Sequence, residues 1–345
     1  MKRKRILITL AGLVVLCLLV YLQVRTWKQF DWHTFWQQTE HVDKLGILDG
    51  IIFTYVAYYL RAVRWRIFLK PMCHTTTRRL LAPQFIGFTG LALLGRAGEV
   101  IRPYIVAKKE NLSFASQMAV WTVERIFDMG AFAVLLAMSF LSPDLRTLPF
   151  YHALREAAFA LIALVLGLVV AAVVIRNYAD RVGNFFYELL SGFAPRFAHH
   201  VRDKIHAFSV GLETIQDTQS ALQLVGVSML MWVLIAFAYI SVTHAYPGEL
   251  RDLTVPMVIV LMGSSMVGSM LQLPAVGGGS QLATISMLST GFGIEHEMAV
   301  SCGILLWAVT FMSVIPTGLL LARREHLSIR AVAEAEQQAE AALAE

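Results

Sequence analysis

Residues 157–175 read AAFALIALVLGLVVAAVVI, a run of 19 residues without a charged side chain. A helix of about 20 apolar residues crosses the hydrocarbon core of a bilayer, which is roughly 30 Å thick. Apolar blocks of similar length recur along the chain, and polar segments separate them. The period-2 alternation typical of outer-membrane barrels is absent from the sequence. The sequence therefore predicts an all-α, polytopic membrane helix bundle.

The composition of the chain agrees with this fold class. Of its 345 residues, 57% are hydrophobic and 15% are charged, and the mean hydropathy is +0.61. Soluble proteins carry about 25% charged residues, so a soluble fold would leave too much apolar surface exposed. The net charge is +5, but the basic residues flank apolar blocks, which indicates membrane topology rather than nucleic-acid binding.

Six blocks are predicted to cross the membrane completely. No small-residue cleavage site follows the first block, so we interpret it as a retained span rather than a signal peptide. We expect one transmembrane domain over 1–322 and a cytoplasmic, Ala/Glu-rich helical tail over 323–345. Two further segments, 25–44 and 176–220, mix aromatic and polar residues and are predicted to lie at the membrane interface. The predicted spans are about 6–24, 45–62, 116–141, 157–175, 222–245 and 298–322.

Two other apolar blocks are interrupted in the middle. The block 80–107 breaks at 95–99 and has basic residues on both flanks, which favours a re-entrant hairpin open to the cytoplasm. The block 254–294 contains a first arm over 255–273, breaks at 274–280, and is predicted to open outward. These hairpins and the six spans make about eight helical membrane elements. The alternative is that each block forms an ordinary pair of short spans.

The distribution of positive charge predicts the orientation of the chain. The segments assigned to the inner side hold 22 Lys and Arg residues, including Arg61 and Arg64 at the end of the second span, whereas the outer segments hold six. This bias places both termini in the cytoplasm and the protein in the inner (cytoplasmic) membrane. Each hairpin is then framed by two spans, and the two triplets have inverted topology. Transporters often bind substrate between such inverted repeats.

Charged residues within a predicted span are the main candidates for function. A charge at the bilayer centre costs about 2.5–3.5 kcal/mol on insertion scales, and the third span contains Glu124, Arg125 and Asp128. Glu124 and Asp128 are four residues apart and share a helix face, while Arg125 points elsewhere. The partners expected from the first hairpin are Arg96, Glu99 and Arg102. We expect these six charged side chains, three positive and three negative, to converge in one polar pocket. The alternative is a closed salt-bridge cluster that only holds the hairpin in place.

The breaks in the two hairpins are rich in glycine. Gly95 and Gly98 allow the backbone to turn sharply and approach a ligand, and an interrupted helix exposes N–H groups that favour phosphate. No metal-ligand spacing or cofactor motif appears in the sequence, and we assign no catalytic residue. The substrate-binding candidates in the second hairpin are Pro274, Gly277, Gly278, Gly279 and Gln281.

Two of these segments resemble family motifs. The run GRAGEVIRP at 95–103, followed by VERIFD at 123–128, resembles the GRxGExxRP…ERxxD signature of the flippase-like lysylphosphatidylglycerol synthase transmembrane family. The run LPAVGGG at 273–279 is similar to that family's second motif, a proline before a Gly-rich break. The resemblance extends over about 6–322. Many members carry Glu where this chain has Gln281.

The resemblance implies a function in lipid movement. The family includes the membrane half of the multiple peptide resistance factor, which moves aminoacylated phosphatidylglycerol across the bilayer, and relatives linked to polyprenyl-phosphate and glycolipid handling. The soluble aminoacyl-transferase half is missing here, so we expect a translocator of an anionic or polyprenyl-phosphate-linked lipid rather than a synthase. One alternative is a membrane enzyme acting on a lipid-linked substrate, with Glu99 or Asp128 as acid or base. Another is a non-catalytic partner of a separate lipid-modifying enzyme, docked through the interfacial segments or the tail.

The charge bias generates a topology prediction. In a background without Cys17, Cys73 and Cys302, Arg330→Cys should react with a membrane-impermeant thiol reagent only after the cells are permeabilised. Arg251→Cys, in a predicted outer segment, is the matched control and should react in intact cells. Labelling of position 330 from outside would contradict the predicted orientation.

Overall fold

The computed structural model describes residues 32–148, 150–192, 195–212, 217–270 and 278–325. Helices account for the secondary structure of this described part, and no strand occurs in it. The first predicted span (6–24) and most of the tail lie outside the described residues. The all-helical fold class is therefore confirmed for the described part, while the total number of spans stays a prediction.

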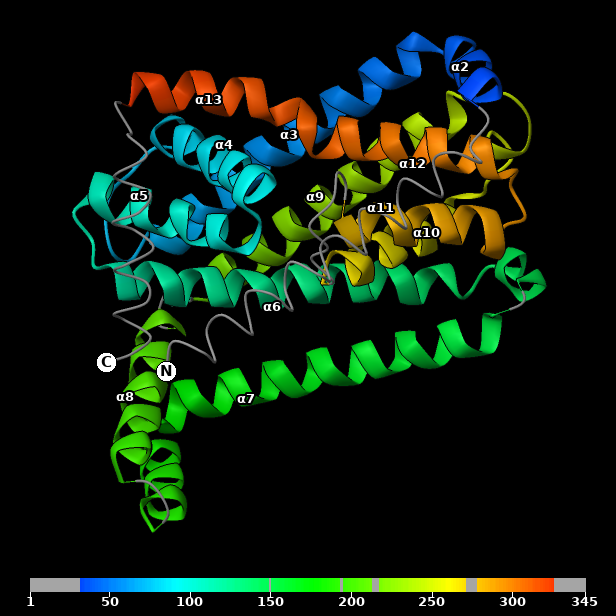
Figure 1. Ribbon diagram of the computed structural model, residues 1–345. Helices are drawn as coiled ribbons and strands as arrows, with labels where there is room; N and C mark the ends of the chain where they lie inside the picture. Colours follow the sequence, from blue (N-terminus) through cyan, green and yellow to red (C-terminus); the bar gives the residue numbers. More distant parts are fainter. Residues whose placement is uncertain (1–31, 149, 193–194, 213–216, 271–277, 326–345) are drawn as a thin grey trace, which may run out of the picture.

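Long helices lie side by side and form the body of the protein (Figure 1). Four stretches are long and apolar enough to cross a membrane, and they match four of the predicted spans. The helix that corresponds to the third predicted span has 26 residues and carries Glu124, Arg125 and Asp128. The four stretches are Lys44–Leu69 (α3), Tyr151–Ile175 in α7, Thr218–His244 (α9) and His296–Arg324, and the charged helix is α6 (Phe114–Ser139).

Helix α3 extends further than the sequence predicted. Asp43 caps its N-terminus by accepting a hydrogen bond from the backbone N of Leu45 at 2.9 Å. The predicted end at residue 62 is wrong, because Trp65 and Leu69 are fully buried and keep the helix in the bundle to Leu69. Arg61 and Arg64 consequently lie inside the bundle and are not charges of a loop.

The first hairpin consists of α4 (Thr77–Leu94), a 3-10 turn η1 (Gly95–Val100) and α5 (Ile101–Glu110). The chain reverses at η1, and α5 packs against α4. Gly98 lies so close to the backbone of Gly90 that a Cβ atom at position 98 would overlap it. A glycine is therefore required where the turn η1 packs against α4.

The second hairpin consists of α10 (Val255–Ser269), α11 (Gly278–Ser286) and a π-helical turn, η4 (Met287–Gly291). Helix α10 ends four residues before the predicted end of its arm at 273, and Pro274 and Gly277 lie outside the described residues. Gly268 contacts the backbone carbonyl of Gly279, again without room for a Cβ atom. Figure 1 places the two hairpins toward opposite ends of the long helices. That each hairpin re-enters a bilayer stays a prediction.

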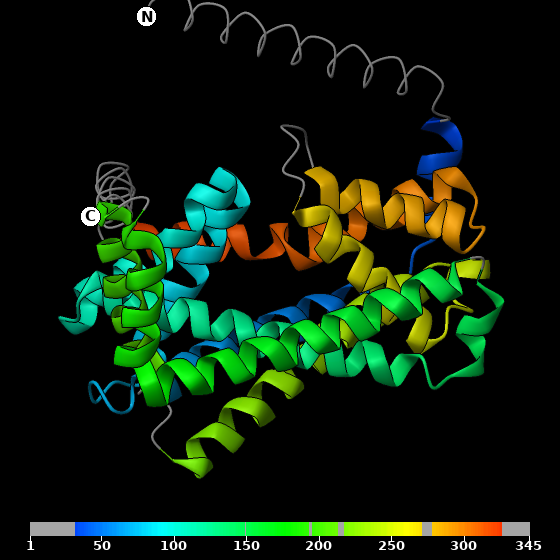
Figure 2. The same cartoon turned by 90° about the horizontal axis from the view of Figure 1, so that it is seen from below.

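The remaining elements surround this bundle. Helix α7 (Tyr151–Ser191) is kinked at Tyr178, where the backbone is not helical (φ −137°, ψ 36°), and its end packs against α8 (Pro195–Leu212). Figure 2 shows α7 running the length of the bundle before this turn. The largest apolar core joins α3, α6, α9, α10 and α12 (His296–Thr310). The short elements are α2 (Trp32–Glu40), η2 (Pro143–Thr147), η3 (Gly248–Leu250), η5 (Met312–Val314) and α13 (Ile315–Arg324).

The close approach in the first hairpin generates a stability prediction. Gly98→Ala should lower the melting temperature of the detergent-solubilised protein, because overpacking a well-packed contact costs about 1–3 kcal/mol. Gly167→Ala is the matched control: no atom outside its own helix lies within 4 Å of that Cβ position, and the change should be neutral or slightly stabilising. Equal melting temperatures for the two variants would show that η1 does not pack closely against α4 at Gly98.

Candidate functional site

Two helices present opposite charges to each other in the interior. Helix α6 places Glu124 and Asp128 on one face, where their exposed fractions are 0% and 5%. Helix α3 places Arg61 and Arg64, three residues apart, against that face. Because the charges are removed from water, each one requires a partner.

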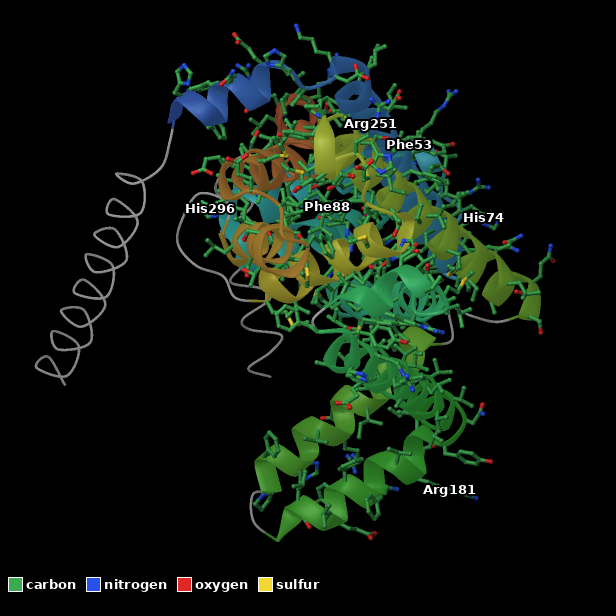
Figure 3. The ribbon with its side chains drawn as sticks, turned by 90° about the vertical axis from the view of Figure 1, so that its right-hand side faces the viewer. Phe53, His74, Phe88, Arg181, Arg251 and His296 are labelled. Atoms are coloured by element: carbon green, nitrogen blue, oxygen red, sulfur yellow. The ribbon has the colours of Figure 1, made fainter. Side chains whose placement is uncertain are left out.

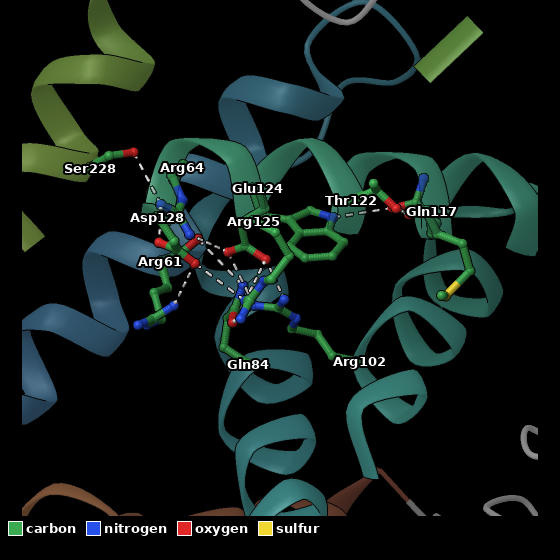
Figure 4. A network of polar contacts seen from close by, with 12 residues as sticks. Arg61, Arg64, Gln84, Arg102, Gln117, Thr122, Glu124, Arg125, Asp128 and Ser228 are labelled. Atoms are coloured by element: carbon green, nitrogen blue, oxygen red, sulfur yellow. Dashed lines mark hydrogen bonds and ion pairs between the residues drawn. The ribbon is translucent and has the colours of Figure 1, made fainter. Parts of the chain in front are cut away.

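Arg64 is fully buried, as Glu124 is, and lies at the centre of this network (Figure 4). Its guanidinium donates to Asp128 Oδ1 at 2.7 Å and to Glu124 Oε1 at 2.5 Å. It also donates to Ser228 Oγ of α9 at 3.0 Å, and Trp232 Nε1 of the same helix donates to Asp128 at 3.1 Å. One arginine thus joins α3, α6 and α9.

Arg102 connects the first hairpin to the same carboxylates. It forms a bidentate contact with Glu124, donates to Gln84 Oε1 of α4 at 3.0 Å, and lies over the ring of Trp65 at 4.3 Å. Planar guanidinium groups are suited to such combined stacking and pairing. The predicted contact between hairpin one and the charged helix is therefore present, with Arg102 as its centre.

Arg61 and Arg125 are held less tightly. Arg61 Nη1 lies 3.6 Å from Asp128 Oδ2, and its guanidinium is 4.9 Å from the ring centre of Phe88. Arg125 was expected to point elsewhere, and this is wrong: its Nη2 reaches Asp128 at 3.3 Å and Glu124 at 3.5 Å. The long side chain bends back along its own helix, although 40% of it remains exposed.

The network does not have the expected balance of three charges of each sign. Four guanidinium groups surround two carboxylates in the described part of the structure. Glu99 is half-buried and lines a cavity of about 30 Å³ together with Arg102 and Arg125. Among the described side chains, none forms an ion pair with Glu99. The structure does not describe the side chains of Leu94 and Arg96, the residues on either side of Gly95. The described cluster thus carries an excess of positive charge.

A larger cavity, of about 180 Å³, lies next to Arg61 in the middle of the bundle. Phe88 of hairpin one lines it, and Ser280 and Gln281 of hairpin two line the same space. Gly278 and Gly279 form the first turn of α11 directly before these residues, and Gly278 has a φ of +55°. Arg61 is the charged side chain among the described residues of the lining. Its polar neighbours are Thr54, Tyr58, Tyr239, Ser265, Ser269, Ser280, Gln281, Thr284 and Thr310.

Sequence reasoning missed part of this site. Arg61 and Arg64 were assigned to the membrane surface because they follow 16 largely apolar residues. A signal was present: Trp65, Phe68 and Leu69 continue the apolar pattern beyond them. Ser228 and Trp232 carry no such signal, because both are ordinary residues of an apolar span until the fold places Asp128 beside them.

Fold and site together define a multi-pass membrane protein built around a buried arginine–carboxylate network. The sequence model of the lysylphosphatidylglycerol synthase TM region matches residues 8–318. The chain belongs to this family, which confirms the resemblance found in its motifs and indicates a function related to membrane lipids. No curated protein and no solved structure matches the chain.

The burial of Glu124 generates a folding prediction. Glu124→Gln should sharply reduce the folded, monodisperse yield in detergent, because removing one partner of a buried ion pair costs about 3–5 kcal/mol. Glu249→Gln, at an exposed position of η3, is the matched control and should leave the yield unchanged. A Glu124→Gln protein with the yield and melting temperature of the wild type would contradict the structural importance of this carboxylate.

Proposed function

We propose that the protein translocates a membrane lipid whose anionic head group binds in the central cavity beside Arg61. The observation that carries the proposal is that Arg61 lines this cavity while belonging to a cluster with four cations and two anions. Phosphate groups and carboxylates are the natural ligands of such a surplus of guanidinium groups. Lipids with a phosphate head group, including polyprenyl phosphates, fall into this class.

Arg61 is the cation of the network best suited to exchange its partner. Its 3.6 Å separation from Asp128 exceeds hydrogen-bond length, whereas Arg64 holds the same carboxylate at 2.7 Å. An incoming phosphate can therefore bind Arg61 without leaving Asp128 unpaired. Arg64 and Arg102 are committed to Glu124 and hold the wall of the cavity in place.

The α11 residues in the lining of this cavity support the same ligand. Ser280 and Gln281 lie in the first turn of α11, whereas Thr284 lies one turn further along and donates its hydroxyl hydrogen to the Ser280 carbonyl at 2.8 Å. Hydroxyl and amide groups donate hydrogen bonds to phosphate, and the N-terminus of a helix has positive polarity. Gln281 is neutral, so it adds a hydrogen-bond donor to the cavity lining without adding a negative charge. A volume of about 180 Å³ corresponds to roughly six water molecules, enough for a head group whose acyl or polyprenyl chains remain in the bilayer.

The proposal generates a transport prediction. Arg61→Gln should reduce the translocation of fluorescent phosphatidylglycerol in proteoliposomes about 10- to 100-fold, because a charge-assisted hydrogen bond contributes about 1.5–3 kcal/mol. The rate is measured from the fraction of label that dithionite reduces after different incubation times. Arg66→Gln, at an exposed position of the same helix, is the matched control and should retain the wild-type rate.

Two outcomes would count against this function. Arg61→Gln protein that folds normally and transports at the wild-type rate would exclude Arg61 as the head-group ligand. Translocation of phosphatidylcholine and phosphatidylglycerol at equal rates by the wild type, both unaffected by Arg61→Gln, would show that the cavity does not select a negative charge.

A further inference from the structure

A pair of helices projects sideways from the bundle. It consists of residues 179–191, which follow the kink of α7, and of α8, and we call it the paddle. Its two helices pack against each other, and α8 also contacts α6. Figures 1 and 3 show that the paddle runs across the direction of the long helices and extends beyond the bundle.

The position of the paddle relative to a bilayer follows from where it joins the apolar stretch of α7. The stretch Tyr151–Ile175 of α7 is apolar enough to span a membrane, and the kink at Tyr178 comes three residues after it. A helix pair that leaves the end of a span at that point, across the direction of the spans, lies along the membrane surface. The paddle is therefore at the depth of the lipid head groups.

The α7 half of the paddle has an apolar side that nothing in the described structure covers. At 100° per residue, Phe185 and Leu189 share one stripe, and 62% and 57% of them are exposed. Gly183 is buried, and Tyr187 contacts His199 of α8 with ring centres 4.7 Å apart, so this side of the helix faces α8. Asn184 and Glu188 are exposed on the sector between these two sides, and the helix is thus amphipathic.

The chemistry of the rest of the paddle matches an anionic lipid surface. Phe197 of α8 is also 57% exposed. The guanidinium groups of Arg181 and Arg202 lie over the rings of Tyr178 and Tyr187, at 5.4 Å in each case. The paddle residues, 179–191 and 195–212, contain four Arg and Lys residues and three Asp and Glu residues. Exposed aromatic residues combined with a positive net charge are typical of helices that lie in the head-group layer of anionic membranes.

We infer that the paddle binds the surface of the bilayer, with Phe185 and Leu189 at the boundary of the acyl chains and the basic residues among anionic head groups. The apolar side then loses its contact with water, and the paddle holds the kinked end of α7 at a constant depth. This inference uses none of the residues of the central cavity, so it stands or falls independently of lipid translocation.

The inference is tested with an environment-sensitive fluorophore in proteoliposomes. The full-length protein, without its native cysteines, is labelled with NBD at Phe185→Cys or Leu189→Cys, and at the matched polar positions Asn184→Cys or Glu188→Cys. In vesicles of phosphatidylcholine with phosphatidylglycerol, the labels at 185 and 189 should emit at shorter wavelength and be quenched by lipids with a spin label high on the acyl chain. The labels at 184 and 188 should behave as water-exposed.

The dependence on lipid charge supplies the second measurement. Arg181→Gln/Arg202→Gln protein labelled at 185 should show weaker quenching than its parent in anionic vesicles and no difference in pure phosphatidylcholine. The inference is overturned if the label at 185 is as water-exposed as the label at 184. It is also overturned if that label is shielded from water but not quenched by lipid, since the apolar side then packs against protein.

Discussion

The structure depends on the requirement that charges buried among apolar helices be paired. Glu124 meets this requirement with two arginines from different segments, Arg64 of α3 and Arg102 of α5. Because an unpaired buried charge is costly, the pairing determines how far α3 extends into the bundle and where the first hairpin lies against α6. Hydrogen bonds from Arg64 to Ser228 and from Trp232 to Asp128 bring α9 into the same arrangement.

The surplus of cations separates structural from exchangeable charges within one cluster. Arg64 and Arg102 are buried and bound at short distance, so they hold helices together. Arg61 is at the boundary of the cluster, has a longer separation from Asp128, and lines a cavity whose other described residues are neutral. A site that binds and releases an anion needs a loosely paired cation that lines a neutral cavity. A cation held in a short ion pair would have to break that ion pair each time a ligand binds.

Both hairpins contribute residues to the lining of this cavity, and in both a glycine makes a close contact with the backbone of another segment. In the first, Gly98 of the turn η1 lies against the backbone of Gly90 in α4, and in the second, Gly268 of α10 lies against the backbone of Gly279 in α11. The two blocks have no obvious sequence similarity, yet both use a residue without Cβ where helices must come closest. Residues of both hairpins, among them Phe88 and Gln281, line the same cavity as Arg61.

The amino-acid sequence alone was sufficient to predict the membrane environment, the helical class, most of the described spans and the two interrupted apolar blocks, because the length of an apolar run and the location of a Gly-rich break are local properties. It also identified Glu124, Asp128 and Arg102, because charges are conspicuous in an apolar block. It assigned Arg61 and Arg64 to the membrane surface, since a charge near the end of a span is equally compatible with an interface and with the interior. The fold resolves this choice in favour of the interior, because burial of an arginine depends on whether a carboxylate from a distant helix lies within a few ångströms of it.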